Sequence, residues 1–119
     1  MSERLPSGVL VSALVRRVHD AGGSAMVLAK GDAQAGAILI VTADRGDHRR
    51  LLERGIGPDG RVTLIDSTPA EDLDGYCQRR RARDPDLWLI ELDIAGAQQF
   101  AAETTVSYTH LTLPTNREV

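Results

Sequence analysis

The spacing of apolar and polar residues predicts one helix at the start of the chain, followed by a series of short strands. From residue 9 to residue 21, apolar side chains recur every three or four positions and polar ones lie opposite, as in an amphipathic helix. Ser7 is the predicted N-cap of this helix, and the two glycines Gly22 and Gly23 end it.

Four segments with the character of strands come next, at residues 24–30, 37–43, 48–54 and 62–66. Ile38 to Val41 are apolar at successive positions, which predicts a central strand that is covered on both faces. Residues 48–54 have the polar character of an edge strand, with a helix as the alternative. The short links favour an antiparallel meander. The glycine-containing residues 31–36 predict a hairpin loop, since Ala37 and Ile38 replace the Lys and Ser or Thr of a phosphate-binding loop.

A second helix is predicted from a cap at Ser67 or Thr68 to the basic cluster that ends at Arg83. A proline then stops the helix, and residues 87–93 predict a fifth strand, after which residues 94–100 turn back beside or across it. The predicted fold class is α+β, with a mainly antiparallel sheet of about five strands and two helices, in the order helix, four strands, helix, strand. A parallel pairing of the last strand is the alternative, because a helical crossover precedes it.

Two residues of this pattern are structural candidates. Trp88 lies among Leu and Ile residues and is the predicted anchor of the core. Arg80 falls on the apolar stripe of the second helix, where its methylene groups can cover the core while the guanidinium stays in water. The alternative is an ion pair between Arg80 and Glu91 or Asp93, carboxylates that interrupt an apolar strand.

The net charge of −3 argues against nucleic-acid binding through bulk charge. Arginines still cluster locally, and the candidate basic surface consists of Arg16, Arg17, Arg79 and Arg83. Aromatic residues make up only 3% of the chain, so few side chains can stack on bases. A nucleic-acid-binding module with an arginine-rich face is therefore an alternative and not the favoured function.

No motif indicates a catalytic, cofactor-binding or metal-binding residue. His19, His48 and Cys77 are not at the spacing of metal ligands, and Cys77 lies on an apolar helical stripe where thiols are usually inert. We therefore expect no cofactor, and a small enzyme with an unrecognised site stays an alternative. One cysteine, no secretory leader and no apolar run of about eighteen residues together favour a cytoplasmic protein that does not cross the membrane.

The character of the sequence changes at Val106, where an uncharged stretch rich in Ser and Thr begins. Residues 106–115 resemble the in-frame translation of the transposon-end adaptor that is used in preparing sequencing libraries. We therefore expect a single domain at residues 1–105 and a non-native tail at residues 106–119. The alternative is a natural extension with β propensity.

Several short motifs carry a resemblance to a known bacterial family: Val15-Arg16-Arg17, Ala21-Gly22-Gly23, Lys30-Gly31-Asp32, Ala35-Gly36-Ala37-Ile38, Glu53-Arg54, and the run from Arg79-Arg80-Arg81 through Asp84-Pro85-Asp86-Leu87-Trp88 to Glu91-Leu92-Asp93-Ile94. On these motifs the chain resembles the alphaproteobacterial domain-of-unknown-function 1491 family, over about residues 5–100. The resemblance implies no particular activity, ligand or catalytic residue.

The favoured function is a non-catalytic protein-interaction module, whose partner is another protein or a second copy of the chain. Two helices cannot easily cover both faces of a five-stranded sheet, although residues 26–28 and 38–41 require cover on both. If both helices pack on one side, the other face is an apolar surface that favours a homodimer.

Overall fold

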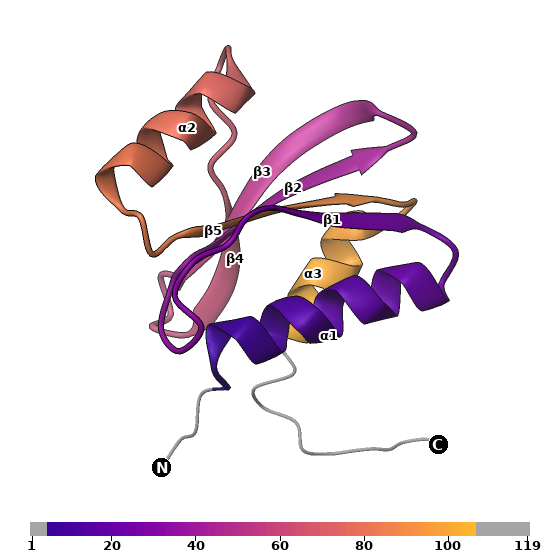
Figure 1. The fold of residues 1–119 in the computed structure, drawn as a ribbon, viewed down its shortest axis with the longest axis horizontal. Coiled ribbons are helices and arrows are strands. Elements are labelled where there is room, and N and C mark those ends of the chain that lie inside the picture. Colours follow the sequence, from indigo (N-terminus) through magenta and orange to yellow (C-terminus); the bar gives the residue numbers. More distant parts are fainter. Residues whose placement is uncertain (1–4, 107–119) are drawn as a thin grey trace.

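The computed structural model describes residues 5–106 as three helices around one five-stranded sheet (Figure 1). In chain order the elements are α1 (Ser7–Asp20), β1 (Ser24–Ala29), β2 (Ile38–Asp44), β3 (Asp47–Ile56), β4 (Val62–Asp66), α2 (Leu73–Arg83), β5 (Trp88–Asp93) and α3 (Ala97–Thr105). The predicted α+β class is confirmed, but the helix count of two is wrong. Apart from Val106, the predicted non-native tail lies outside the described residues.

The additional helix, α3, occupies the segment that was expected to turn back beside the fifth strand. Gly96 precedes α3 with a φ of 74°, a left-handed conformation that glycine adopts without strain. Ala97 and Ala101 are buried one helical turn apart, and α3 packs against α1. The segment therefore continues as a helix because its small side chains fit against a neighbouring helix. Between residues 5 and 106, no helix is long and apolar enough to cross a bilayer.

Helices cover both faces of the sheet. In Figure 1, α1 and α3 lie below the sheet and α2 lies above it. Two separate apolar clusters match this arrangement, one that joins α1 and α3 to the sheet and one that joins α2 to it. An open apolar sheet face was expected only if every helix packed on one side of the sheet, and the helices do not.

The strand order is β1-β5-β2-β3-β4, so β5 is inserted between the first two strands of the chain. It runs parallel to β2 and antiparallel to β1, while β2, β3 and β4 form an antiparallel meander. The hairpin predicted at residues 31–36 is wrong, because β1 and β2 are not neighbours. The predicted edge character of residues 48–54 is also wrong, because β3 lies inside the sheet. The two edges are β1 and β4.

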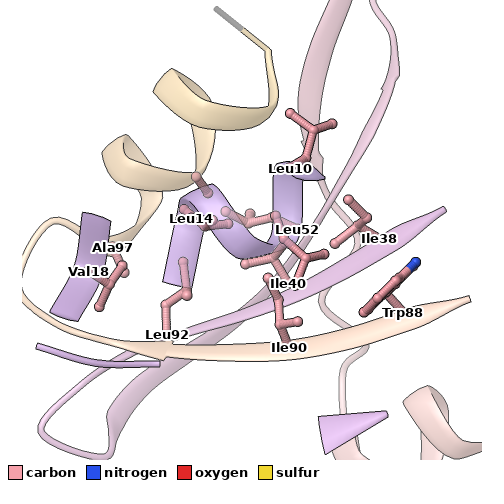
Figure 2. Close-up of a cluster of buried hydrophobic side chains, with 12 residues drawn as sticks. Leu10, Leu14, Val18, Ile38, Ile40, Leu52, Trp88, Ile90, Leu92 and Ala97 are labelled. Carbon is pink, nitrogen blue, oxygen red and sulfur yellow. The ribbon is translucent and has the colours of Figure 1, made fainter. Parts of the chain in front are cut away.

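The larger apolar cluster lies between the sheet and helices α1 and α3. Figure 2 shows Leu10, Leu14 and Val18 of α1 lying over Ile90 and Leu92 of β5. Trp88 lies at the end of this cluster with 5% of its surface exposed. Its indole Nε1 donates a hydrogen bond to the Asp32 carbonyl oxygen at 2.8 Å, so the polar end of the ring is also satisfied.

The start of β5 is held by Arg81 near the end of α2 and by the loop that follows β1. Arg81 donates hydrogen bonds to the carbonyl oxygens of Lys30, Pro85 and Leu87 at 3.0–3.1 Å. The loop after β1 passes directly over this point, where a Cβ on Gly31 or Gly36 would overlap the Asp86 carbonyl. These glycines therefore permit a close backbone crossing and do not form a hairpin turn.

Both predicted helix caps differ from the structure. Ser7 is inside α1, and its hydroxyl donates a hydrogen bond to the Gly36 carbonyl, so it fastens the helix to the loop that crosses β5. The second helix begins later than predicted, with Asp72 as its N-cap and with its carboxylate accepting from the Gly75 amide. Thr68 does not cap a helix, because its hydroxyl oxygen accepts from the Leu51 amide of β3.

Arg81→Ala should destabilise the protein by about 2 kcal/mol, since hydrogen bonds from a charged group contribute about that much. The free energy of unfolding, measured in a denaturant titration, tests this. Arg79→Ala on the same helix is the matched control, because Arg79 is exposed and its nearest carboxylate is 3.8 Å away, so the loss should stay within about 0.5 kcal/mol. Equal losses for the two variants would contradict the role given to Arg81.

Candidate functional site

The edge strand β1 carries three successive apolar side chains that are open to solvent. Met26 is 55% exposed, Val27 42% and Leu28 45%. The chain has no charged residue from position 21 to position 29, so the strand lacks the charges that commonly protect a sheet edge. An exposed, uncharged, apolar edge of this kind is suited to pairing with another strand.

The hydrogen-bonding pattern shows which backbone groups of β1 face outward. The amides of Trp88 and Ile94 donate toward β2, to the carbonyls of Ala37, which immediately precedes it, and of Ala43. Because backbone groups alternate in direction along a strand, the odd-numbered residues of β5 face β1. Met26 lies opposite Glu91, so its backbone N–H and C=O groups point toward β5. The N–H and C=O groups of Ala25 and Val27 point to the open edge.

One side chain confirms this direction. The Nε2 atom of His19, near the end of α1, lies 3.2 Å from the Ala25 carbonyl oxygen. A carbonyl oxygen only accepts, so Nε2 carries the hydrogen in this contact. His19 thus reaches the Ala25 carbonyl from outside the sheet, which shows that a donor can approach this edge.

A groove lies along β1 on the α1 side of the sheet. It has a volume of about 600 Å³, and its walls are mainly apolar, formed by Val11, Val15, Val27 and Trp88. Arg16, His19, Asp20 and Lys30 lie at its rim. The groove is therefore mainly apolar, with charged residues of α1 and Lys30 also lining it.

A second groove lies along the same strand on the α2 side. Its volume is about 660 Å³, and Leu28, Val41 and Leu89 of the sheet and Cys77 and Ala82 of α2 form its apolar walls. It lies beside β1 because α2 packs on side chains of β2, β3 and β5, Leu89 among them, and on none of β1. Successive side chains of a strand point to opposite faces of a sheet. A strand added beside β1 would therefore point alternate side chains into the two grooves.

The other edge, β4, is different. It has five residues, follows Arg61, and ends at Asp66. The Asp66 carboxylate accepts hydrogen bonds from Thr68 and Arg50, which lower its pKa to about 2. A charged residue at each end makes this short edge less suited to pairing than β1, although Val62 and Ile65 are exposed.

Arg80 pairs with Glu53 and not with Glu91, the predicted partner. Its two terminal nitrogens donate to the two Glu53 carboxylate oxygens at 2.9 Å, and one of them also contacts the Tyr76 hydroxyl at 3.1 Å. Glu91 instead lies 3.9 Å from Arg49, which pairs with Asp74 at 2.8 Å. Asp93 accepts from the Arg45 and Gly46 amides. The α2 face of the sheet therefore carries two hydrogen-bonded ion pairs between α2 and β3, with Glu91 of β5 as a longer contact of Arg49.

The structure does not bring the four arginines of the candidate basic surface together. Arg16 and Arg17 lie on α1, and Arg79 and Arg83 lie on α2, which covers the opposite face of the sheet. Arg17 is also engaged, because it pairs with Glu103 and donates to Thr104. This placement gives no continuous arginine-rich surface from these residues.

Cys77 is buried against the sheet, and burial raises the pKa of its thiol. The thiolate form that nucleophilic chemistry requires is therefore disfavoured there. Among residues 5–106, no three His, Cys, Asp or Glu side chains come together as a metal site would require.

The fold and this site define a class: a small α+β domain, helices on both faces, with one open apolar edge strand. The chain belongs to the family described as Protein of unknown function (DUF1491), whose family model matches residues 5–102. The resemblance seen in the sequence motifs is thereby confirmed. No curated protein matches the chain.

Solved structures of bacterial proteins share the fold. A crystal structure of a DUF1491 family protein from Caulobacter crescentus CB15 is 34% identical, with a TM-score of 0.72, and the match covers 81% of this chain and 94% of that one. An NMR structure of a DUF1491 family protein from the same organism is 35% identical, with a TM-score of 0.68 and coverage of 82% and 93%. A solution structure of a protein from A. tumefaciens is 28% identical, with a TM-score of 0.65 and coverage of 88% and 94%.

A double-mutant cycle should show coupling between Arg80 and Glu53. Their side chains are 28% and 21% exposed and form two parallel hydrogen bonds, so we expect a coupling energy of about 1–2 kcal/mol in the free energy of unfolding. The control cycle pairs Arg80→Ala with Glu91→Ala and should be additive within about 0.5 kcal/mol. Coupling between Arg80 and Glu91, without coupling between Arg80 and Glu53, would favour the pairing with Glu91.

Glu53 should also contribute to the acid sensitivity of the fold. Its pKa lies below the ordinary value of 4.5 because Arg80 donates hydrogen bonds to its carboxylate. The ion pair contributes its full stabilisation above the ordinary pKa of 4.5. This stabilisation is lost as the pH falls through the lower pKa of Glu53 in the folded protein. Glu53→Gln should therefore lose less stability than the wild type between neutral pH and about pH 3. Parallel stability curves for the two proteins would rule out this contribution.

Proposed function

We propose that this protein is a non-catalytic, cytoplasmic interaction module that binds an extended strand of another polypeptide along β1. The observation that carries the proposal is the edge itself, where Met26, Val27 and Leu28 are exposed between two apolar grooves. Binding by strand addition needs only backbone hydrogen bonds and pockets for alternate side chains, and β1 offers both.

The outward-facing backbone groups support the same function. Ala25 and Val27 each present one donor and one acceptor to the open edge. An added strand would satisfy both donors and the Val27 acceptor, and it would replace or share the His19 contact at the Ala25 carbonyl. The apolar side chains of that strand would enter the grooves on the α1 and α2 sides, where Val27 and Leu28 form part of the walls. Burial of such surface supplies about 25 cal/mol per Å² of apolar area, the main stabilising contribution.

An extended peptide provides the direct test. An acetylated and amidated heptapeptide of alternating Val and Thr should shift the NMR signals of the Ala25 and Val27 amides and slow their hydrogen exchange. The Met26 amide, which faces β5, should change less. Perturbation of β4 amides alone, or of none, would refute strand addition at β1.

Val27→Pro should weaken binding of this peptide about tenfold or more, because proline removes the outward N–H without removing a hydrogen bond to β5. Val62→Pro on the opposite edge is the matched control. The amide of Ser67 donates to Leu51, so by alternation Val62 faces outward on β4 in the same way. Val62→Pro should leave the peptide affinity unchanged, and an equal loss in both variants would count against β1.

A further inference from the structure

We infer that the strand that pairs with β1 is β1 of a second copy of this chain, with the two Met26 residues facing each other across a two-fold axis. This inference rests on the proposed function, because it names the occupant of the same edge. It follows from the direction of the backbone groups, the absence of charge along the strand and the charges at its two ends.

Symmetry restricts how two copies of an edge strand can pair. A two-fold axis perpendicular to the sheet makes the strands antiparallel and keeps each face of the sheet on its own side. Residues that pair must therefore lie on the same face, so Met26 can oppose Ser24, Met26 or Leu28 but cannot oppose Val27.

Among these registers, one uses every outward-facing group of the regular part of β1. With Met26 opposite Met26, Ala25 of each copy lies opposite Val27 of the other. Both residues face the open edge, so each of the two pairs forms two backbone hydrogen bonds, with the partner strand replacing or sharing the His19 contact at the Ala25 carbonyl. The register shifts after Val27, where a bulge interrupts the strand, and this limits regular pairing to the first part of β1.

The charges at the ends of β1 are complementary in the same arrangement. Lys30 follows the strand, and Asp20 ends the helix that precedes it; both lie at the rim of the α1-side groove. With Met26 on the axis, the Lys30 end of one strand lies beside the end of the other copy where α1 stops at Asp20. Lys30 of one copy therefore comes near Asp20 of the other at each end of the paired strands, beside Arg16 and His19, and the uncharged strand between the ends adds no repulsion.

The paired strands would extend each five-stranded sheet into one of ten strands and cover the exposed Met26 and Val27 side chains of both copies. Met26 lies on the α2 side, opposite Glu91, so the two thioethers would pack together beside the α2-side grooves. Methionine adapts its shape to such contacts because its side chain is unbranched and flexible.

Cysteine cross-linking tests both the occupant and the register. Facing residues at the Met26 position would have Cα atoms about 4.5 Å apart, within the range of a disulfide bond. Met26→Cys should therefore form a covalent dimer in a glutathione redox buffer. In Val27→Cys, the matched control, the introduced thiols lie two positions apart along the strands, beyond the roughly 7 Å limit, so cross-linking should be at least fivefold slower. Native Cys77 can stay in both variants because it is buried.

Light scattering on the wild-type chain, from micromolar to millimolar concentration, should show a dimer that Val27→Pro converts to monomer. A wild-type monomer throughout, without cross-linking of Met26→Cys, would overturn self-pairing. If the Val-Thr peptide still perturbs Ala25 and Val27, strand addition stands and only the occupant is wrong. If the peptide has no effect either, the proposed function fails as well. Faster cross-linking in Val27→Cys than in Met26→Cys would overturn the Met26 register.

Discussion

The structure depends on the insertion of β5 between β1 and β2. This strand makes the central parallel pair with β2 and the antiparallel pair with β1, so without it the first strand has no place in the sheet. Its start is fixed by Arg81, whose guanidinium binds three carbonyl oxygens from two segments, and by Trp88, whose indole bonds the loop that crosses above it. These contacts join the end of α2, the loop after β1 and the start of β5.

The same insertion determines where the exposed apolar surface lies. Because β5 takes the position beside β2, β1 is displaced to the edge, and the cluster under α2 includes residues of β2, β3 and β5 but none of β1. The uncovered apolar area is therefore a narrow band along β1 with a groove on each face, and not a broad sheet face. A surface of this shape favours a single extended strand over a flat partner.

The charged residues have mainly structural roles. The Arg80–Glu53 and Arg49–Asp74 pairs both fasten α2 to β3, which compensates for the few apolar side chains on this helix. Arg17 likewise joins α1 to α3 through Glu103 and Thr104. The sequence showed that Arg80 interrupts an apolar stripe, but not which of several carboxylates faces it, because that choice depends on how α2 lies across the sheet.

The amino-acid sequence by itself determined the α+β class, the approximate position of every strand, and the first two helices, because apolar periodicity and turn residues act locally. It also showed, through its motifs, the family to which the chain belongs. Tertiary structure decided the order of the strands, the partner of Arg80 and the edge position of β1. These features depend on contacts between residues distant in sequence: the glycines after β1 look like turn residues, and only the packing of Asp86 beneath them shows that they permit a crossing.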